Sequence, residues 1–132
     1  HVVGEQRKNA DLIKESISDL PLEMRTVPEN SFETSDALVF LVDSNQTALA
    51  CRETLLESGL GTKILPEAIT WHFAGMWNHM PELVNRNGED LSKAFPKSLE
   101  LLNKSVSLPI NVNMTDNFIE LIRDALISVL KK

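Results

Sequence analysis

Apolar residues recur at helical spacing near both ends of the chain. Between residues 4 and 20, Ile13, Ile17 and Leu20 lie four and three positions apart, which predicts a surface helix with one buried stripe, ended by Pro21. Near the other end the same spacing predicts a second amphipathic helix. Its apolar residues are Phe118, Ile119, Ile122, Leu126, Val129 and Leu130.

The middle of the chain predicts a strand followed by a helix. The run 37–42 is apolar without polar alternation, so we expect a central strand covered on both faces. Asp43, Ser44 and Asn45 can cap a helix that runs to about Ser58, and Gly59 is a natural helix stop. The buried positions expected in that helix are Ala48, Cys51 and Leu55.

Shorter elements complete the predicted domain. Residues 24–27, 62–65 and 106–110 are brief extended segments, and Pro109 confines the last of them to an edge or an end of a sheet. A helix is expected from Leu91 to Leu102, with Pro96 as a suitable first residue. The pattern predicts a single α/β (α+β) domain over residues 1–132, in which helices pack on a small sheet of three to four short strands.

Composition narrows the classes of function. The chain has 132 residues and a net charge of −6 without a stripe of Lys or Arg, which argues against nucleic-acid or anionic-membrane partners. Its longest apolar run is too short to span a bilayer, and no export pattern is evident, so a cytoplasmic location is expected. The single cysteine, Cys51, is interpreted as a core residue.

Candidate binding residues gather between residues 63 and 79. Binding groups concentrate in loops mounted on a rigid sheet, and aromatic rings beside donors and acceptors suit a polar ligand such as a sugar. The alternative is that Trp71, Phe73 and Trp77 cover the sheet and that His72 is a hydrogen-bonded core residue. His72 and His79 have no third ligand at usable spacing, so no metal site is predicted. The candidates are Lys63, Glu67, Trp71 and His72, with Trp77 and His79 nearby.

Three motifs carry a family resemblance. They are Arg7-Lys8-Asn9-Ala10, Gly59-Leu60-Gly61-Thr62, and Val106-Ser107-Leu108-Pro109-Ile110 followed by Met114-Thr115-Asp116. In this order and spacing the whole chain resembles the C-terminal small domain of the DegT/StrS family of pyridoxal-phosphate-dependent sugar aminotransferases. The resemblance implies the small domain of a fold-type I enzyme.

The loop region is similar to one subgroup of that family. The segment 61–73, with Trp77-Asn78-His79, resembles transaminases that make 8-amino-3,8-dideoxy-manno-octulosonate (8-amino-Kdo), a sugar of lipopolysaccharide. Many other members carry a tyrosine-proline pair where this chain has Leu65-Pro66. The resemblance implies transfer of an amino group from glutamate to an eight-carbon keto-acid sugar.

The resemblance also implies what the chain lacks. In this family the Schiff-base lysine and the acidic partner of the cofactor ring lie in a large N-terminal domain, and no lysine here has the context of that motif. We therefore expect no catalytic residue in this chain, inactivity of the chain alone, and function beside the large domain in a homodimer.

Site roles follow from position in the matching loop. Lys63 and His72 are expected to face the carboxylate of the sugar, Trp71 to cover the sugar face, and Glu67 to contact a hydroxyl. Two enzyme alternatives remain open, a perosamine-type nucleotide-sugar aminotransferase and a pyridoxal-phosphate-dependent sugar dehydratase. A non-catalytic binding module is the third alternative.

Overall fold

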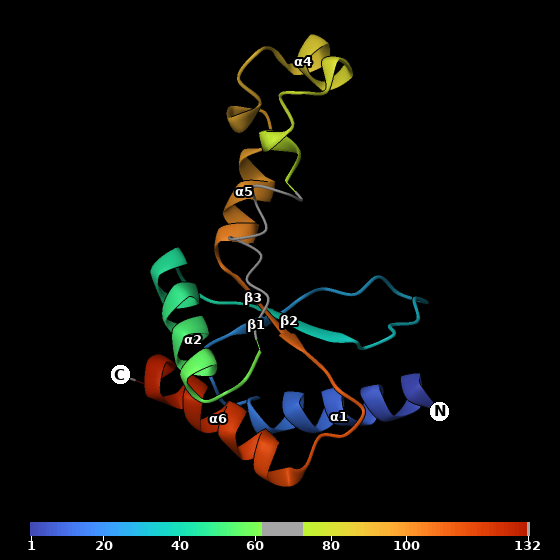
Figure 1. Cartoon of the computed structure of the whole chain (residues 1–132), viewed down its shortest axis with the longest axis vertical. Coiled ribbons are helices and arrows are strands. Elements are labelled where there is room, and N and C mark those ends of the chain that lie inside the picture. Colours follow the sequence, from blue (N-terminus) through green and yellow to red (C-terminus); the bar gives the residue numbers. More distant parts are fainter. Residues whose placement is uncertain (62–72, 132) are drawn as a thin grey trace.

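The computed structural model describes residues 1–61 and 73–131, which form a body and a projecting arm (Figure 1). The body comprises residues 1–61 and 104–131, and the arm comprises residues 73–103. Figure 1 shows the arm rising from one side of a small sheet, with helices on the other side. The fold is α+β, as the sequence predicts.

Within the described residues, three antiparallel strands form the sheet. They are β1 (Glu23–Met24), β2 (Ala37–Leu41) and β3 (Ser105–Pro109), in the order β1-β2-β3. Leu38 pairs with Leu108 and Phe40 pairs with Val106, so these four side chains share one face. Pro109 is the last residue of β3, which agrees with the prediction that it lies at an edge or an end of the sheet.

Three helices cover that face. They are α1 (Val2–Ser16), α2 (Asn45–Glu57) and α6 (Asp116–Leu130), and their apolar sides meet the sheet in one core. Ile13, Ile17 and Leu20 are buried as predicted, although α1 itself ends at Ser16. Ile122 and Leu126 are also fully buried, while Phe118 and Ile119 are partly buried against the core.

β2 differs from the expectation in one respect. Burial alternates along the strand: Leu38 and Phe40 are buried, whereas Ala37, Val39 and Leu41 are only half-buried. The expectation that both faces are covered is met fully on the face that the body helices cover and only partly on the other face of β2.

The prediction for α2 is confirmed in detail. The Ser44 hydroxyl oxygen accepts a hydrogen bond from the Thr47 backbone N–H at 3.1 Å and caps the helix. Gly59, with φ of 78°, then ends it in the left-handed region. Ala48, Cys51 and Leu55 are fully buried, and burial raises the pKa of the Cys51 thiol to about 11.

The arm contains four helical segments among the described residues. In order along the chain they are η1 (Ala74–Met76), α4 (Pro81–Asn87), η2 (Leu91–Lys93) and α5 (Pro96–Asn103). The first two lie in the region that the sequence pattern left irregular, and the last two lie within the predicted helix from Leu91 to Leu102. The start of α5 at Pro96 is confirmed, whereas α4 was expected to be irregular. The predicted extended segment 62–65 lies outside the described residues.

Candidate functional site

The four predicted substrate-binding residues, Lys63, Glu67, Trp71 and His72, all lie outside the described residues. The described chain on either side of them is anchored. Leu60 is 1% exposed in the core of the body, and Phe73 is 4% exposed in the arm. The predicted site is therefore flanked by one buried residue of each part of the molecule.

The described half of the aromatic region belongs to the arm. Phe73 packs edge-to-face on Phe95, with ring centroids 6.3 Å apart, and is not part of the core beneath the sheet. Trp77 is half-buried and His79 is exposed. The alternative in which Phe73 covers the sheet is therefore wrong.

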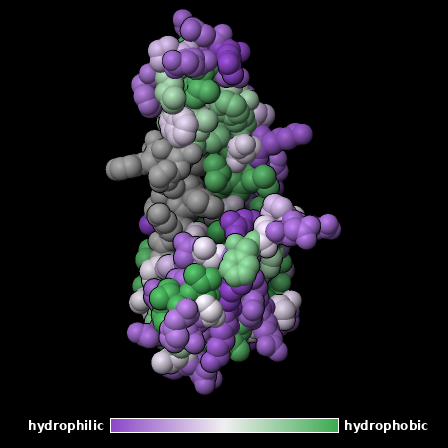
Figure 2. Space-filling model, turned by 90° about the vertical axis from the view of Figure 1, so that its right-hand side faces the viewer, coloured by the Kyte–Doolittle hydropathy of each residue, from purple (hydrophilic) through white to green (hydrophobic). Residues whose placement is uncertain are grey.

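The arm buries few of its apolar side chains. Phe73, Gly75 and Leu91 are buried, whereas α4 and α5 contain no fully buried residue. Figure 2 shows hydrophobic surface gathered along the arm above the more hydrophilic body. Exposed large apolar residues of the arm are Met76, Met80 and Leu101.

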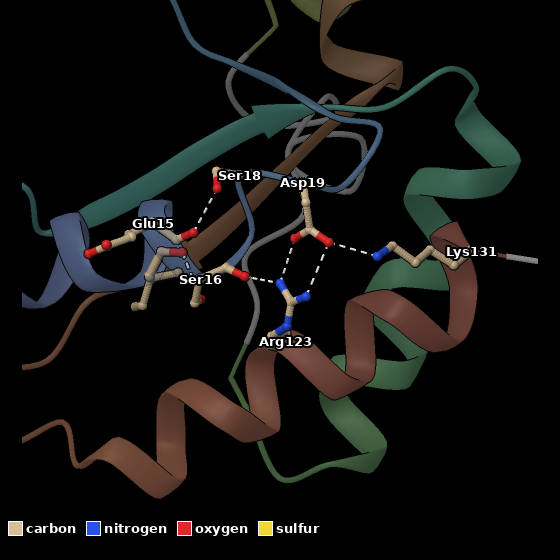
Figure 3. A network of polar contacts seen from close by, with 7 residues as sticks. Glu15, Ser16, Ser18, Asp19, Arg123 and Lys131 are labelled. Atoms are coloured by element: carbon tan, nitrogen blue, oxygen red, sulfur yellow. Dashed lines mark hydrogen bonds and ion pairs between the residues drawn. The ribbon is translucent and has the colours of Figure 1, made fainter.

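A cluster of polar side chains links the turn after α1 to α6 (Figure 3). The Asp19 carboxylate accepts hydrogen bonds from Arg123 Nη1 and Nη2 at 2.7 and 3.1 Å, and from Lys131 Nζ at 2.7 Å. Arg123 also donates to the Ser16 carbonyl oxygen. The hydrogen bonds from Arg123 and then Lys131 hold the pKa of Asp19 well below its usual range.

Another polar cluster lies beside the loop between β1 and β2. Arg25, the residue after β1, forms an ion pair with Glu33, and Nζ of Lys14 in α1 lies 3.9 Å from the same carboxylate. These residues line a cavity of about 150 Å³. No sequence pattern indicated this cluster, because Glu33 lies in a polar loop without periodicity.

The described lysines are not arranged as a cofactor site. Lys14 lines two cavities, of about 150 and 300 Å³, but its amine is engaged by carboxylates. The amines of Lys14, Lys93, Lys104 and Lys131 all pair with nearby carboxylates at the surface. None of these four is placed as a Schiff-base lysine in an enclosed pocket.

Neither a metal-binding cluster nor a membrane-spanning helix is found among the described residues. Within residues 1–61 and 73–131, no group of three or more His, Cys, Asp or Glu side chains is placed to hold a metal ion. Among the helices in these ranges, none is long and apolar enough to cross a membrane.

Solved structures share this arrangement of elements. A Streptococcus pneumoniae protein described as a sugar aminotransferase, in its apo-form, superposes with a TM-score of 0.70 at 12% identity, over 97% of this chain and 30% of its own. A DegT DnrJ EryC1 StrS aminotransferase from Brucella abortus gives a TM-score of 0.67 at 11% identity, over 99% of this chain and 32% of its own.

The chain has the fold of one portion of a sugar aminotransferase. It spans about 30% of the length of the structures it matches. The S. pneumoniae protein has also been solved in PLP- and PMP-forms. No family model and no curated protein sequence matches the chain.

A related enzyme with different chemistry shares the fold. The GDP-4-keto-6-deoxy-D-mannose-3-dehydratase of E. coli, with bound hydrated PLP, gives a TM-score of 0.58 at 14% identity, over 94% of this chain and 30% of its own. The fold alone therefore does not separate amino transfer from dehydration.

Proposed function

We propose that this chain is the C-terminal small domain of a pyridoxal-phosphate-dependent sugar aminotransferase. The observation that carries the proposal is the superposition of nearly the whole chain on about 30% of a sugar aminotransferase. The motifs at residues 59–62 and 106–116 support the C-terminal position within the enzyme. The large domain and a second copy of the enzyme would complete the active site.

The cofactor in this proposal is held mainly by the large domain. Pyridoxal phosphate supplies the chemistry by which an amino group moves from glutamate to a sugar carbonyl. The surface pairing of Lys14, Lys93, Lys104 and Lys131 supports this division of labour, because those lysines already have structural partners. The role of this chain is substrate recognition.

The proposed substrate is an eight-carbon keto-acid sugar, converted to its 8-amino derivative for lipopolysaccharide. Lys63 and His72 pair with the sugar carboxylate, Trp71 covers the sugar face and Glu67 accepts from a hydroxyl. These roles rest on the resemblance of the segment 61–73 to the family's substrate-facing loop.

One labelling experiment tests the domain assignment. The purified chain is incubated with pyridoxal phosphate, reduced with borohydride, and analysed by intact mass and peptide mapping. We expect scattered labelling or none, because the Schiff-base lysine lies in the other domain. Stoichiometric labelling of one lysine would mean that this chain holds its own cofactor, and the proposal would have to be abandoned.

The substrate assignment is tested by Lys63→Ala in the complete enzyme. Hydrogen bonds to charged groups contribute about 1.5–3 kcal/mol, so the KM for the sugar should rise about tenfold or more while the KM for glutamate stays nearly constant. Lys97→Ala, on the exposed surface of α5, is the matched control and should change neither KM. Equal effects of Lys63→Ala on both substrates would contradict the assignment.

A second candidate is dehydration of a nucleotide sugar. The shared fold of the E. coli dehydratase favours keeping it. Product analysis of the complete enzyme separates the two: an aminotransferase yields an amino sugar and consumes glutamate stoichiometrically, whereas a dehydratase yields a deoxy-keto sugar. If the complete protein binds the sugar but catalyses neither reaction, the third alternative, a non-catalytic binding module, is favoured.

A further inference from the structure

The loop over residues 27–36, between β1 and β2, is held to the body at Phe32 and Glu33, and at its end by a hydrogen bond from the Ile110 N–H to the Asp36 carbonyl oxygen. Most of its residues are exposed, including Phe32 at 75%, whereas Glu33 is half-buried. Figure 1 shows this loop extending away from the sheet. Its position therefore depends on the contacts of Glu33 and its neighbour Phe32.

Cations from two elements converge on those two residues. Arg7 Nε of α1 donates to the Glu33 carbonyl oxygen at 2.8 Å, and the Arg7 guanidinium lies 3.1 Å from the centroid of the Phe32 ring. Arg25 donates to one oxygen of the Glu33 carboxylate, and Lys14 lies 3.9 Å from the other. The Asp11 carboxylate lies 3.7 Å from Nζ of Lys14 and competes with Glu33 for that cation.

A cavity of about 150 Å³ lies at these charges. Its apolar lining comes from three elements and includes Ala10, Met24 and Leu38. Lys14, Arg25 and Glu33 line the same cavity. An apolar wall beside the cations Lys14 and Arg25 suits a ligand that has a carboxylate and a short hydrocarbon chain. The Glu33 carboxylate already contacts both of these cations.

The loop backbone is suited to release. Asn30 and Ser35 lie on either side of Glu33 with φ of 62° and 59°, a region that non-glycine residues rarely adopt. Such conformations persist only where surrounding contacts hold them. The contacts here are surface ion pairs, which contribute little to stability, so the loop can open without loss of the fold.

We propose that this cavity is a binding site for a small aliphatic carboxylate, that Glu33 is its internal occupant, and that the 27–36 loop is the latch that a ligand opens. The ligand carboxylate takes the place of Glu33 on Arg25 and Lys14, and its hydrocarbon chain lies against Ala10, Met24 and Leu38. This proposal uses none of the sugar-binding residues proposed above and does not depend on them.

The test is a titration of the isotope-labelled chain with hexanoate, followed by amide NMR shifts. We expect saturable shifts at Ala10 and Leu38, together with faster hydrogen exchange in residues 30–35 as the latch opens. Glu33→Gln removes the internal carboxylate and should tighten hexanoate binding about two- to fivefold, the range set by a surface ion pair. Glu29→Gln, on the exposed part of the same loop, is the matched control and should bind as the unaltered chain does.

Hexanamide has the same chain without the charge and should give no saturable shifts. The proposal is overturned if hexanoate binds neither the unaltered chain nor Glu33→Gln. It is also overturned if Glu33→Gln and Glu29→Gln bind equally, or if hexanamide binds as well as hexanoate. Because the readout involves no cofactor or sugar, its failure leaves the aminotransferase proposal untouched.

Discussion

Asp19, in the turn that follows α1, makes a polar link between that end of α1 and α6. Its carboxylate receives a two-pronged contact from Arg123 and a third hydrogen bond from Lys131. A single exposed ion pair contributes little to the free energy of unfolding. A bidentate arginine–carboxylate contact within a network of charges contributes more. At the residue scale, Asp19 is therefore a structural group whose effect depends on its charge.

The pH dependence of stability tests this role. The pKa of Asp19 is lower in the folded chain than in the unfolded chain, so the stabilisation is present above the unfolded value and is lost as pH falls below about 4. Asp19→Asn should lower the melting temperature at pH 7, and the difference from the unaltered chain should shrink in acid. Thermal melts from pH 7 to pH 2 measure it.

Asp11→Asn is the control, because Asp11 is more exposed and has a single 3.7 Å contact with Lys14. It should lower the melting temperature less than Asp19→Asn. A difference for Asp19→Asn that stays constant down to pH 2 would contradict the assignment of the effect to ionised Asp19.

At the scale of elements, the arm and the body are stabilised unequally. The body helices bury apolar stripes against the sheet, whereas the arm relies on a small cluster around Phe73, Phe95 and Leu91. A Cβ at Gly75 would overlap the Phe73 ring, so the close approach of η1 to that ring requires glycine. Phe73 is itself held by burial and by its contact with Phe95, so it cannot easily move aside.

Gly75→Ala should therefore loosen the arm selectively. Overpacking costs about 1–3 kcal/mol, and hydrogen exchange should speed up in η1 and η2 while the amides of α6 remain protected. Gly4→Ala is the matched control, because no described atom lies within 4 Å of a Cβ there and alanine favours the helix. Unchanged exchange in η1 would show that Phe73 has room to move.

At the scale of the whole molecule, the described helices of the body pack on one face of the sheet. The opposite face is buried at Ser105 and Ser107 of β3 but only half-buried at Ala37, Val39 and Leu41 of β2. Exposed apolar side chains of the arm are Met76, Met80 and Leu101, and apolar surface of this kind is typical of a contact with further protein. This arrangement supports the proposal that the chain works beside a larger domain.

Periodicity in the sequence determined the body. The stripe Ile13, Ile17 and Leu20, the capped and glycine-terminated α2, and the position of Pro109 at the end of β3 all follow from local rules, and the structure confirms them. These features were predictable because side-chain spacing fixes which face of an element is buried, and caps fix where it ends.

Tertiary structure decided the rest. No local pattern indicated that β2 is fully covered on one face only, that Phe73 packs with Phe95 in a separate arm, or that Glu33 joins Lys14 and Arg25 beside a cavity. Each depends on contacts between residues far apart in the chain, and such contacts leave no periodic trace in the sequence. The substrate residues at 63, 67, 71 and 72 remain a prediction from the family resemblance.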